Sequence, residues 1–286
     1  MTSDVQTAET LLRASPLPLL EARILLGHTL GWSRTELITR SDRPLDAADI
    51  ARFRALEARR VAGEPVAQLV GAREFFGLTF EVTPDVLIPR PETELLVETA
   101  LNALAGLSRP RVLDLGTGTG AIAVAIASMR PDASVWALDR SDAALQVAQR
   151  NAAALLDAPR PGGPLHFTAS DWYAALDPAL RFDVIVSNPP YIANGDPHLA
   201  EGDLRFEPRG ALTDGADGLS AIRLIVAGAA ARFDASTGGV LWMEHGYDQA
   251  ADVRALLTAH GFSDVRSERD LAGIERISGG RLPRRT

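Results

Sequence analysis

The second half of this 286-residue chain alternates between short apolar runs and segments with helical composition, and this alternation limits the possible folds most strongly. Continuous apolar runs of four to six residues are typical of strands that are covered on both faces. Strands are expected over residues 111–115, 135–139, 165–169, 182–187 and 240–244. Strands that alternate with helices form a doubly wound, largely parallel α/β sheet, in which ligands bind outside the carboxyl ends of the strands. The tail, around residues 265 and 273–278, is expected to add a closing antiparallel pair.

The fourth expected strand ends in the tetrapeptide Asn188-Pro189-Pro190-Tyr191. Asn188 and Pro189 each precede a proline, which restricts both to extended geometry. The Asn188 side-chain oxygen and the Pro189 carbonyl can then accept both hydrogens of an exocyclic amino group, on an amide or an amino-purine. Tyr191 supplies a flat face for that planar group. Such a site works by positioning and preorganised electrostatics, with no general base needed before the nitrogen attacks.

Further residues suited to a nucleotide follow the other expected strands. Asp139 lies 23 residues beyond Gly116, near the usual distance for an acid that binds ribose hydroxyls. Trp172, beside Asp171, offers a face on which adenine could pack. A glycine turn follows the first strand, and its members are Gly116, Thr117, Gly118, Thr119 and Gly120. Its spacing differs from the Gly-x-Gly-x-x-Gly of dinucleotide-binding proteins, and each feature alone also has a structural interpretation. Their shared place at strand ends indicates a ligand site.

The rest of the chain suggests three divisions. Residues 1–65 are expected to form a helical domain, 66–88 a β-hairpin linker that turns near Gly77, and 89–286 the catalytic domain. The helical domain holds no catalytic constellation, so it is either a docking surface or a stabilising cap. Residues 192–219 are expected to form a long loop that walls or covers the site.

For residues 88–94 and His245 the sequence allows both a structural and a functional interpretation. Residues 88–94 either begin a helix or form a rim of the site, and the roles of Arg90 and Glu92 stay open. His245 ends the fifth expected strand, where a structural role is favoured over that of a general base.

Composition excludes several classes of function. The chain has no cysteine and five scattered histidines, so no metal site is expected. A net charge of −8 argues against extensive non-specific binding of nucleic acid. No signal peptide and no apolar run of about 18 residues is found, so a cytoplasmic enzyme without membrane contact is expected.

The joint pattern resembles the class I methyltransferases that use S-adenosylmethionine, and more narrowly the PrmC/HemK family, which methylates the glutamine side-chain amide of peptide chain release factors. The general resemblance rests on residues 113–120, 139, 170–172 and 186–191, and the narrower one on 88–94, 196–199, 205–208, 244–246 and the helical N-terminal region. It implies a mostly parallel seven-stranded sheet, S-adenosylmethionine as methyl donor with S-adenosylhomocysteine as product, and class I release factors as protein substrates.

The resemblance also implies roles for individual residues. The helical domain would recognise the body of the release factor. The glutamine of a Gly-Gly-Gln tripeptide would be held by Asn188, Pro189, Pro190 and Tyr191. The cofactor would be contacted by Gly116, Thr117, Gly118, Thr119, Gly120, Asp139, Asp171, Trp172 and Asn188.

Four alternatives remain at this stage. A DNA adenine-N6 methyltransferase can use the same tetrapeptide, but it needs base flipping and a basic duplex-binding surface. A glutamine methyltransferase that acts on a ribosomal protein shares the tetrapeptide as well. An NAD-dependent oxidoreductase is disfavoured by the glycine spacing, and a non-catalytic scaffold by the intact set of motifs.

Overall fold

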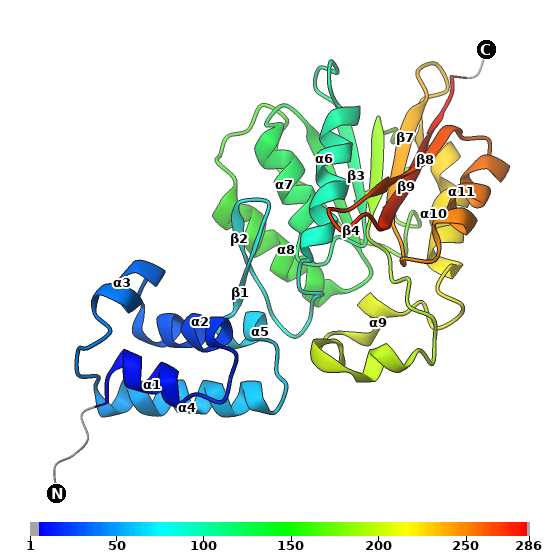
Figure 1. The fold of residues 1–286 in the computed structure, drawn as a ribbon. Coiled ribbons are helices and arrows are strands. Elements are labelled where there is room, and N and C mark those ends of the chain that lie inside the picture. The colour runs from blue at the N-terminus through cyan, green and yellow to red at the C-terminus, as the bar shows by residue number, and fades with distance from the viewer. Residues whose placement is uncertain (1–5, 285–286) are drawn as a thin grey trace, which may run out of the picture. The chain divides into compact units, whose positions relative to one another are not determined.

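The computed structural model describes residues 6–284, in two compact units that meet in the sequence between Ala72 and Arg73 (Figure 1). The first unit is helical, with α1 (Ala8–Ala14), α2 (Leu19–Leu30), α3 (Arg34–Thr39), α4 (Ala47–Val61) and α5 (Val66–Val70). Its core contains the buried side chains of Leu11, Leu25, Leu26, Leu37, Phe53 and Leu69. Residues 66–70, which the sequence assigned to a hairpin linker, are helical instead, because Val66 and Leu69 pack into this core.

The hairpin itself belongs largely to the second unit. It consists of β1 (Ala72–Phe75) and β2 (Leu78–Glu81), and it turns at Phe76 and Gly77, which both have positive φ. Phe75 and Phe80 are buried in the core of this unit. The side chain of Asn151 receives a hydrogen bond from the Glu81 amide (2.7 Å) and donates one to its carbonyl (3.1 Å). The hairpin is therefore packed into the catalytic unit as well as joined to it in sequence.

The second unit is built on a seven-stranded sheet with the order β5-β4-β3-β6-β7-β9-β8. Its strands are β3 (Arg111–Leu115), β4 (Ser134–Asp139), β5 (His166–Ala169), β6 (Val184–Ser187), β7 (Gly239–Glu244), β8 (Ser263–Arg269) and β9 (Glu275–Leu282). The first five of these pair in parallel, and β9 runs antiparallel to both β7 and β8. The predicted α/β fold, with its closing antiparallel pair, is confirmed.

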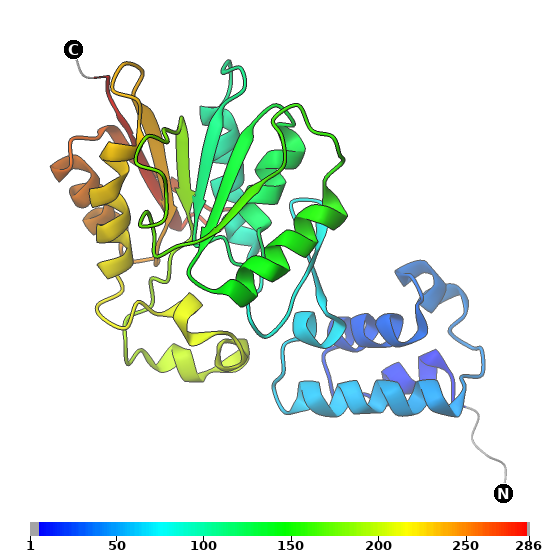
Figure 2. The same ribbon diagram turned by 180° about the vertical axis from the view of Figure 1, so that it is seen from behind.

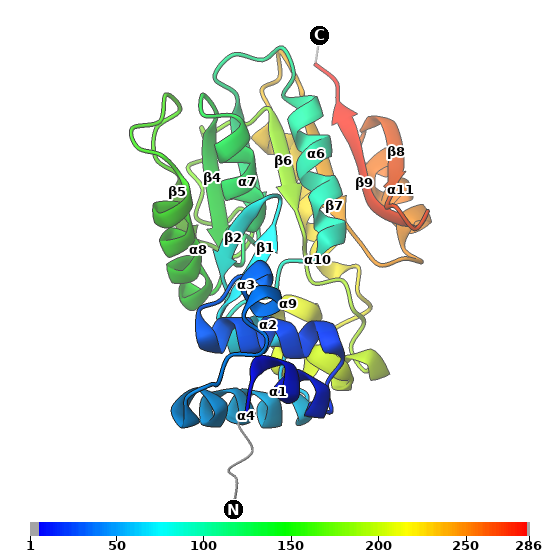
Figure 3. The ribbon, with the colours of Figure 1, turned by 60° about the vertical axis from the view of Figure 1, so that its left-hand side comes forward.

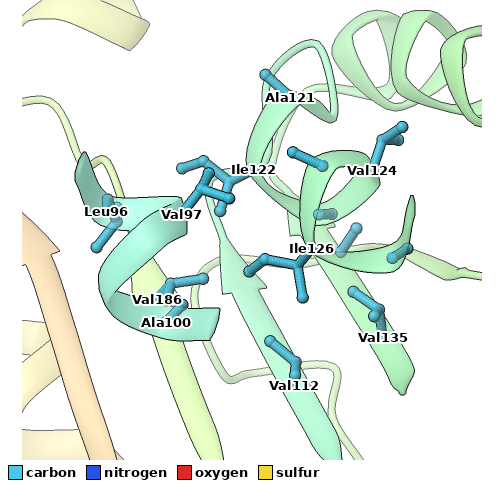
Figure 4. Close-up of a cluster of buried hydrophobic side chains, with 14 of the residues drawn as sticks. Leu96, Val97, Ala100, Val112, Ala121, Ile122, Val124, Ile126, Val135 and Val186 are labelled. Atoms are coloured by element: carbon cyan, nitrogen blue, oxygen red, sulfur yellow. The ribbon is translucent and has the colours of Figure 1, made fainter. Parts of the chain in front are cut away.

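Helices cover both faces of this sheet (Figures 1 and 2). One face carries α6 (Glu94–Ala103), preceded by the short helix η1 (Pro91–Thr93), with α7 (Ala121–Met129) and α8 (Asp142–Leu155). The other carries α10 (Ser220–Ala229), followed by η4 (Ala230–Arg232), and α11 (Ala250–Ala259). The strands supply both cores: Val112 packs with α6 and α7 (Figure 4), whereas Leu113 packs on the opposite side with the α10 and α11 residues. This two-sided burial explains why the strands are continuously apolar.

The loop after β6 contains short helical turns, namely η2 (Pro197–Ala200), η3 (Gly202–Phe206) and α9 (Arg209–Leu212). Figure 3 shows this segment near the strand ends of the sheet. Its two ends are joined by a parallel bridge between Ile192 and Thr213. In the described part of the chain, no helix is both long and apolar enough to cross a membrane.

Candidate active site

The register of the parallel strands brings their carboxyl ends to one edge of the sheet. Leu115 of β3 pairs with Leu138 of β4 on one side and with Ser187 of β6 on the other. Gly116, Asp139 and Asn188 follow these positions directly, so all three meet at that edge.

A pocket of about 230 Å³ opens at this edge. The residues proposed from the sequence that line it are Gly116, Thr117, Gly118, Thr119, Asp139, Asp171, Trp172, Asn188 and Pro190. Among the described residues, Gly120, Pro189 and Tyr191 are not part of this lining. Gly120 instead directly precedes α7. A Cβ added there would lie 3.1 Å from the Cβ of Ala148 in α8, so the close packing of these two helices explains why this residue is glycine.

The glycine turn is held by hydrogen bonds to β4. The amides of Gly116 and Thr117 both donate to the carbonyl of Leu138, at 2.8 and 2.9 Å. The Gly118 amide donates to Asp139 Oδ2 at 2.9 Å. Gly116 and Gly118 have φ of +72° and +55°, a backbone region that side-chain-bearing residues rarely adopt. At Gly116 and Gly118 the turn thus lines the pocket with backbone that carries no side chain.

Asp139 is fixed at the end of β4 as an acceptor. Besides the Gly118 amide, it binds the Ser141 amide through Oδ1 at 2.9 Å. Each carboxylate oxygen can accept a second hydrogen bond. Asp139 is therefore held in one orientation and retains the capacity to bind a pair of hydroxyl groups.

Trp172 adopts a left-handed backbone conformation, with φ +48°. Ser170 stabilises this turn, because its hydroxyl donates to the Trp172 carbonyl (2.8 Å) and accepts from the Ala175 amide (3.0 Å). The indole lies beside the glycine turn. Its Cζ3 is 3.8 Å from the point where a Cβ added to Gly116 would lie. It lines the pocket as a flat apolar surface.

Asn188 is linked to a buried carboxylate. Its Nδ2 donates to Thr93 Oγ1 at 3.1 Å, and the Thr93 hydroxyl donates to Glu244 Oε2 at 2.6 Å. The Tyr191 hydroxyl donates to the other oxygen of Glu244 at 3.1 Å. Burial raises the pKa of Glu244 above its usual range, and burial together with the nearby Glu244 charge also raises the pKa of the Tyr191 hydroxyl.

His245 is fully buried and has a partner at each ring nitrogen. Nδ1 lies 2.8 Å from the Gly246 carbonyl and Nε2 lies 2.7 Å from the Ser278 hydroxyl. Burial lowers the pKa of its imidazole, which favours the neutral ring. These contacts support the structural interpretation of His245.

Arg90 and Glu207 connect the segment before α6 to the loop after β6. Arg90 forms an ion pair with the buried carboxylate of Glu207, which also accepts the Ile88 amide at 2.8 Å. The neighbouring loop residues Pro208 and Gly210 line the pocket. The loop is therefore a wall of the pocket, and Arg90 helps to anchor it, whereas Glu92 is exposed.

Sequence reasoning did not identify four of these polar residues: Thr93, Ser170, Glu207 and Glu244. The motifs that contain them support the family resemblance, but the sequence alone assigns no role to these side chains. A carboxylate at the last position of an apolar strand, as Glu244 is in β7, is a detectable signal because buried charges need partners.

Two family models match the chain. The PrmC N-terminal domain matches residues 5–71, and the methyltransferase small domain matches residues 91–202. The release factor glutamine methyltransferase of Burkholderia pseudomallei (strain K96243) is 74% identical over 277 residues, which cover 97% of this chain and 96% of that protein. The one of Bordetella pertussis (strain Tohama I) is 58% identical over 266 residues, covering 93% of this chain and 96% of that protein.

Solved structures share the fold at low sequence identity. The T. thermophilus 16S rRNA methyltransferase RsmC, in complex with AdoMet and guanosine, has a TM-score of 0.52 and 24% identity, covering 75% of this chain and 50% of that one. A methyltransferase from Pyrococcus furiosus has a TM-score of 0.51 and 18% identity, covering 79% of this chain and 98% of that one. These likenesses concern the fold alone.

Proposed function

This chain belongs to the family of release factor glutamine methyltransferases, and on that premise we propose that its strand-end pocket holds S-adenosylmethionine beside a glutamine side chain. As a member of the family, the enzyme transfers a methyl group to the glutamine side-chain amide of peptide chain release factors. The observation that carries the proposal is that Asn188 lines the same pocket as the glycine turn and Asp139. The residue proposed to hold the amino group and the residues proposed to bind the nucleotide thus line one cavity.

The residues that line the pocket have the chemistry to bind S-adenosylmethionine. Asp139 would bind the ribose hydroxyls, since its carboxylate is fixed by the Gly118 and Ser141 amides and keeps free acceptor capacity. Trp172 would lie against the adenine, and Asp171 stands beside it at the wall. The bare backbone of Gly116 and the rest of the turn would allow close approach. When bound, this cofactor supplies a methyl group attached to a positively charged sulfur.

The glutamine amide would be held at Asn188, Pro189, Pro190 and Tyr191. The side-chain oxygen of Asn188 and the carbonyl of Pro189 would accept the two hydrogens of the amide nitrogen. This arrangement would leave the nitrogen lone pair free to attack the methyl carbon. A nitrogen–carbon bond would form as the carbon–sulfur bond breaks, with the electron pair remaining on sulfur. The methylated amide would then lose its additional proton to water.

The substrate class follows from similarity along the whole chain. Relatives that cover more than nine tenths of it carry the name of release factor enzymes, which favours glutamine over adenine and release factors over a ribosomal protein. Within that class we propose the glutamine of the Gly-Gly-Gln tripeptide in class I release factors, in the cytoplasm where they act. The helical unit would recognise the release factor body.

The test is a methylation assay with S-adenosylmethionine and purified release factor, read by peptide mass spectrometry. One added methyl group on the glutamine of the Gly-Gly-Gln peptide is the expected result. Asn188→Ala should lower kcat by at least about a hundredfold, while cofactor binding is weakened but measurable. Methyl transfer to adenine in duplex DNA, with none to the release factor, would contradict the proposed substrate.

A further inference from the structure

Glu244 lies at the centre of a hydrogen-bond chain that ends on Asn188. Its carboxylate is buried at the end of β7, where it accepts the hydroxyls of Thr93 and Tyr191 through different oxygens. Thr93 is itself buried at the end of η1, and its hydroxyl oxygen accepts the Asn188 Nδ2 group. Three segments far apart in sequence, around residues 93, 188 and 244, are therefore connected by a continuous series of hydrogen bonds.

While Glu244 is ionised, the direction of each hydrogen bond in this chain is determined by chemistry. An ionised carboxylate only accepts hydrogen bonds, and a hydroxyl has a single hydrogen to donate. Because Thr93 donates its hydrogen to Glu244, its oxygen can only accept from Asn188. The Asn188 side chain must therefore turn its NH₂ group toward Thr93 and leave Oδ1 for the pocket.

This matters because the two ends of an amide have nearly the same shape. Packing around Asn188 therefore discriminates poorly between its two orientations. A substrate amino group donates two hydrogens, so only the orientation with Oδ1 in the pocket can accept one of them. The reverse orientation would place N–H groups against N–H groups.

We propose that Glu244 and Thr93 are positioning residues, which fix the orientation of the Asn188 amide so that Oδ1 is presented to the substrate nitrogen. This inference rests on the proposed function of Asn188 and extends it. Neither residue exchanges a proton with the substrate. Glu244 acts through Thr93 on Asn188, and it also orients the hydroxyl of Tyr191.

The charges around Glu244 add a dependence on pH. Burial raises the pKa of Glu244, the nearby Glu92 raises it further, and the hydrogen bonds from Thr93 and Tyr191 together with Arg276 oppose this. A protonated Glu244 can donate to Thr93, which then can donate to Asn188 and reverse its amide. The active form is thus the ionised one, and kcat should decrease as the pH falls through the raised pKa.

The experiment compares Thr93→Val with Thr93→Ser in the full-length enzyme, with purified release factor as substrate. Valine has nearly the shape of threonine without its hydroxyl, so kcat should fall by about tenfold or more while KM changes by less than about threefold. Serine keeps the hydroxyl and should retain kcat within about threefold. Thermal melting and the Kd for S-adenosylmethionine verify that both variants are folded. A Thr93→Val enzyme with the kcat of the unaltered protein would overturn the proposal.

Glu244→Gln provides an independent test if Thr93→Val does not fold. Glutamine cannot ionise, so the acidic limb of the kcat profile should disappear. An unchanged acidic limb in Glu244→Gln would overturn the role of Glu244. If the unaltered enzyme fails to methylate the glutamine, the proposed function itself is wrong. If it methylates normally but the variants do as well, only the positioning role is wrong.

Discussion

At the scale of single residues, Asp114 shows how the ligand site tolerates a buried acid. It lies in β3, two residues before Gly116 of the glycine turn, is fully buried, and accepts a hydrogen bond from the Thr117 hydroxyl at 2.6 Å. Burial raises its pKa from 3.8 to about 7, the charge of Asp139 adds to this, and the bond from Thr117 opposes it. The acid therefore titrates near neutral pH in the folded protein.

This shift predicts a specific effect of pH on stability. Below the unfolded pKa of 3.8 both states are protonated, and as the pH rises toward about 7 only the unfolded state readily ionises. Folding thus loses stability over this window, by up to roughly 4 kcal/mol. Asp114→Asn removes the ionisation, so its free energy of unfolding relative to the unaltered protein should increase from acidic to mildly alkaline pH. Chemical denaturation at both ends of the window measures this, and a constant difference would contradict it.

At the scale of structural elements, the loop after β6 is a wall of the pocket held at several points. Gln249 donates through Nε2 to the carbonyls of Tyr191 and Gly218, at 3.0 and 3.3 Å, and so joins the beginning and end of the loop. In the middle of the loop, Glu207 accepts a hydrogen bond from the Ile88 amide and forms an ion pair with Arg90. The loop is long in sequence but constrained in space.

We expect Glu207→Gln to weaken cofactor retention, because the buried Arg90 contact loses its charge partner and the adjacent wall at Pro208 and Gly210 loosens. The Kd for S-adenosylmethionine should rise by about tenfold, measured by calorimetry. The matched control is Asp217→Asn in the same loop, which weakens an exposed ion pair with Arg223 of α10 and should leave the Kd unchanged. Equal effects of the two changes would show that Glu207 has no special role.

At the scale of the whole molecule, each of the two units has a pocket of its own. The second unit contains the pocket and every side chain to which we assign a part in transfer. The helical unit has its own groove, lined by Leu12, Leu19, Leu37 and Ile38 together with Arg13, Arg23 and Arg34. Ile38 is 64% exposed there, a large apolar side chain available to a protein surface.

If this unit binds the release factor body, Ile38→Asp should raise KM for the intact release factor severalfold and leave KM for a short Gly-Gly-Gln peptide unaltered. The matched control is Leu271→Asp, since Leu271 is fully exposed on the catalytic unit. Steady-state kinetics with both substrates distinguishes the outcomes. An equal rise in KM for the peptide would indicate damage to the pocket rather than to a docking surface.

Local sequence patterns determined most of the fold. Apolar runs bounded by turns predicted β3, β4 and β7 within one residue of their observed limits and β6 within two, because strands covered on both faces must be apolar throughout. The start of α3 is also set locally, because Ser33 forms a capping box with Glu36. The segment at 66–70 was wrongly assigned, since its helix depends on packing into the core of the helical unit.

For the site, the sequence by itself determined which residues stand at strand ends, and hence that Gly116, Asp139 and Asn188 would meet. This follows from parallel pairing, which aligns carboxyl ends without further information. Only the tertiary structure decided what surrounds them. The bonds from Asn188 to Thr93 and from Thr93 to Glu244 join positions 95 and 151 residues apart. Such contacts depend on how layers pack, and they leave no local pattern in the chain.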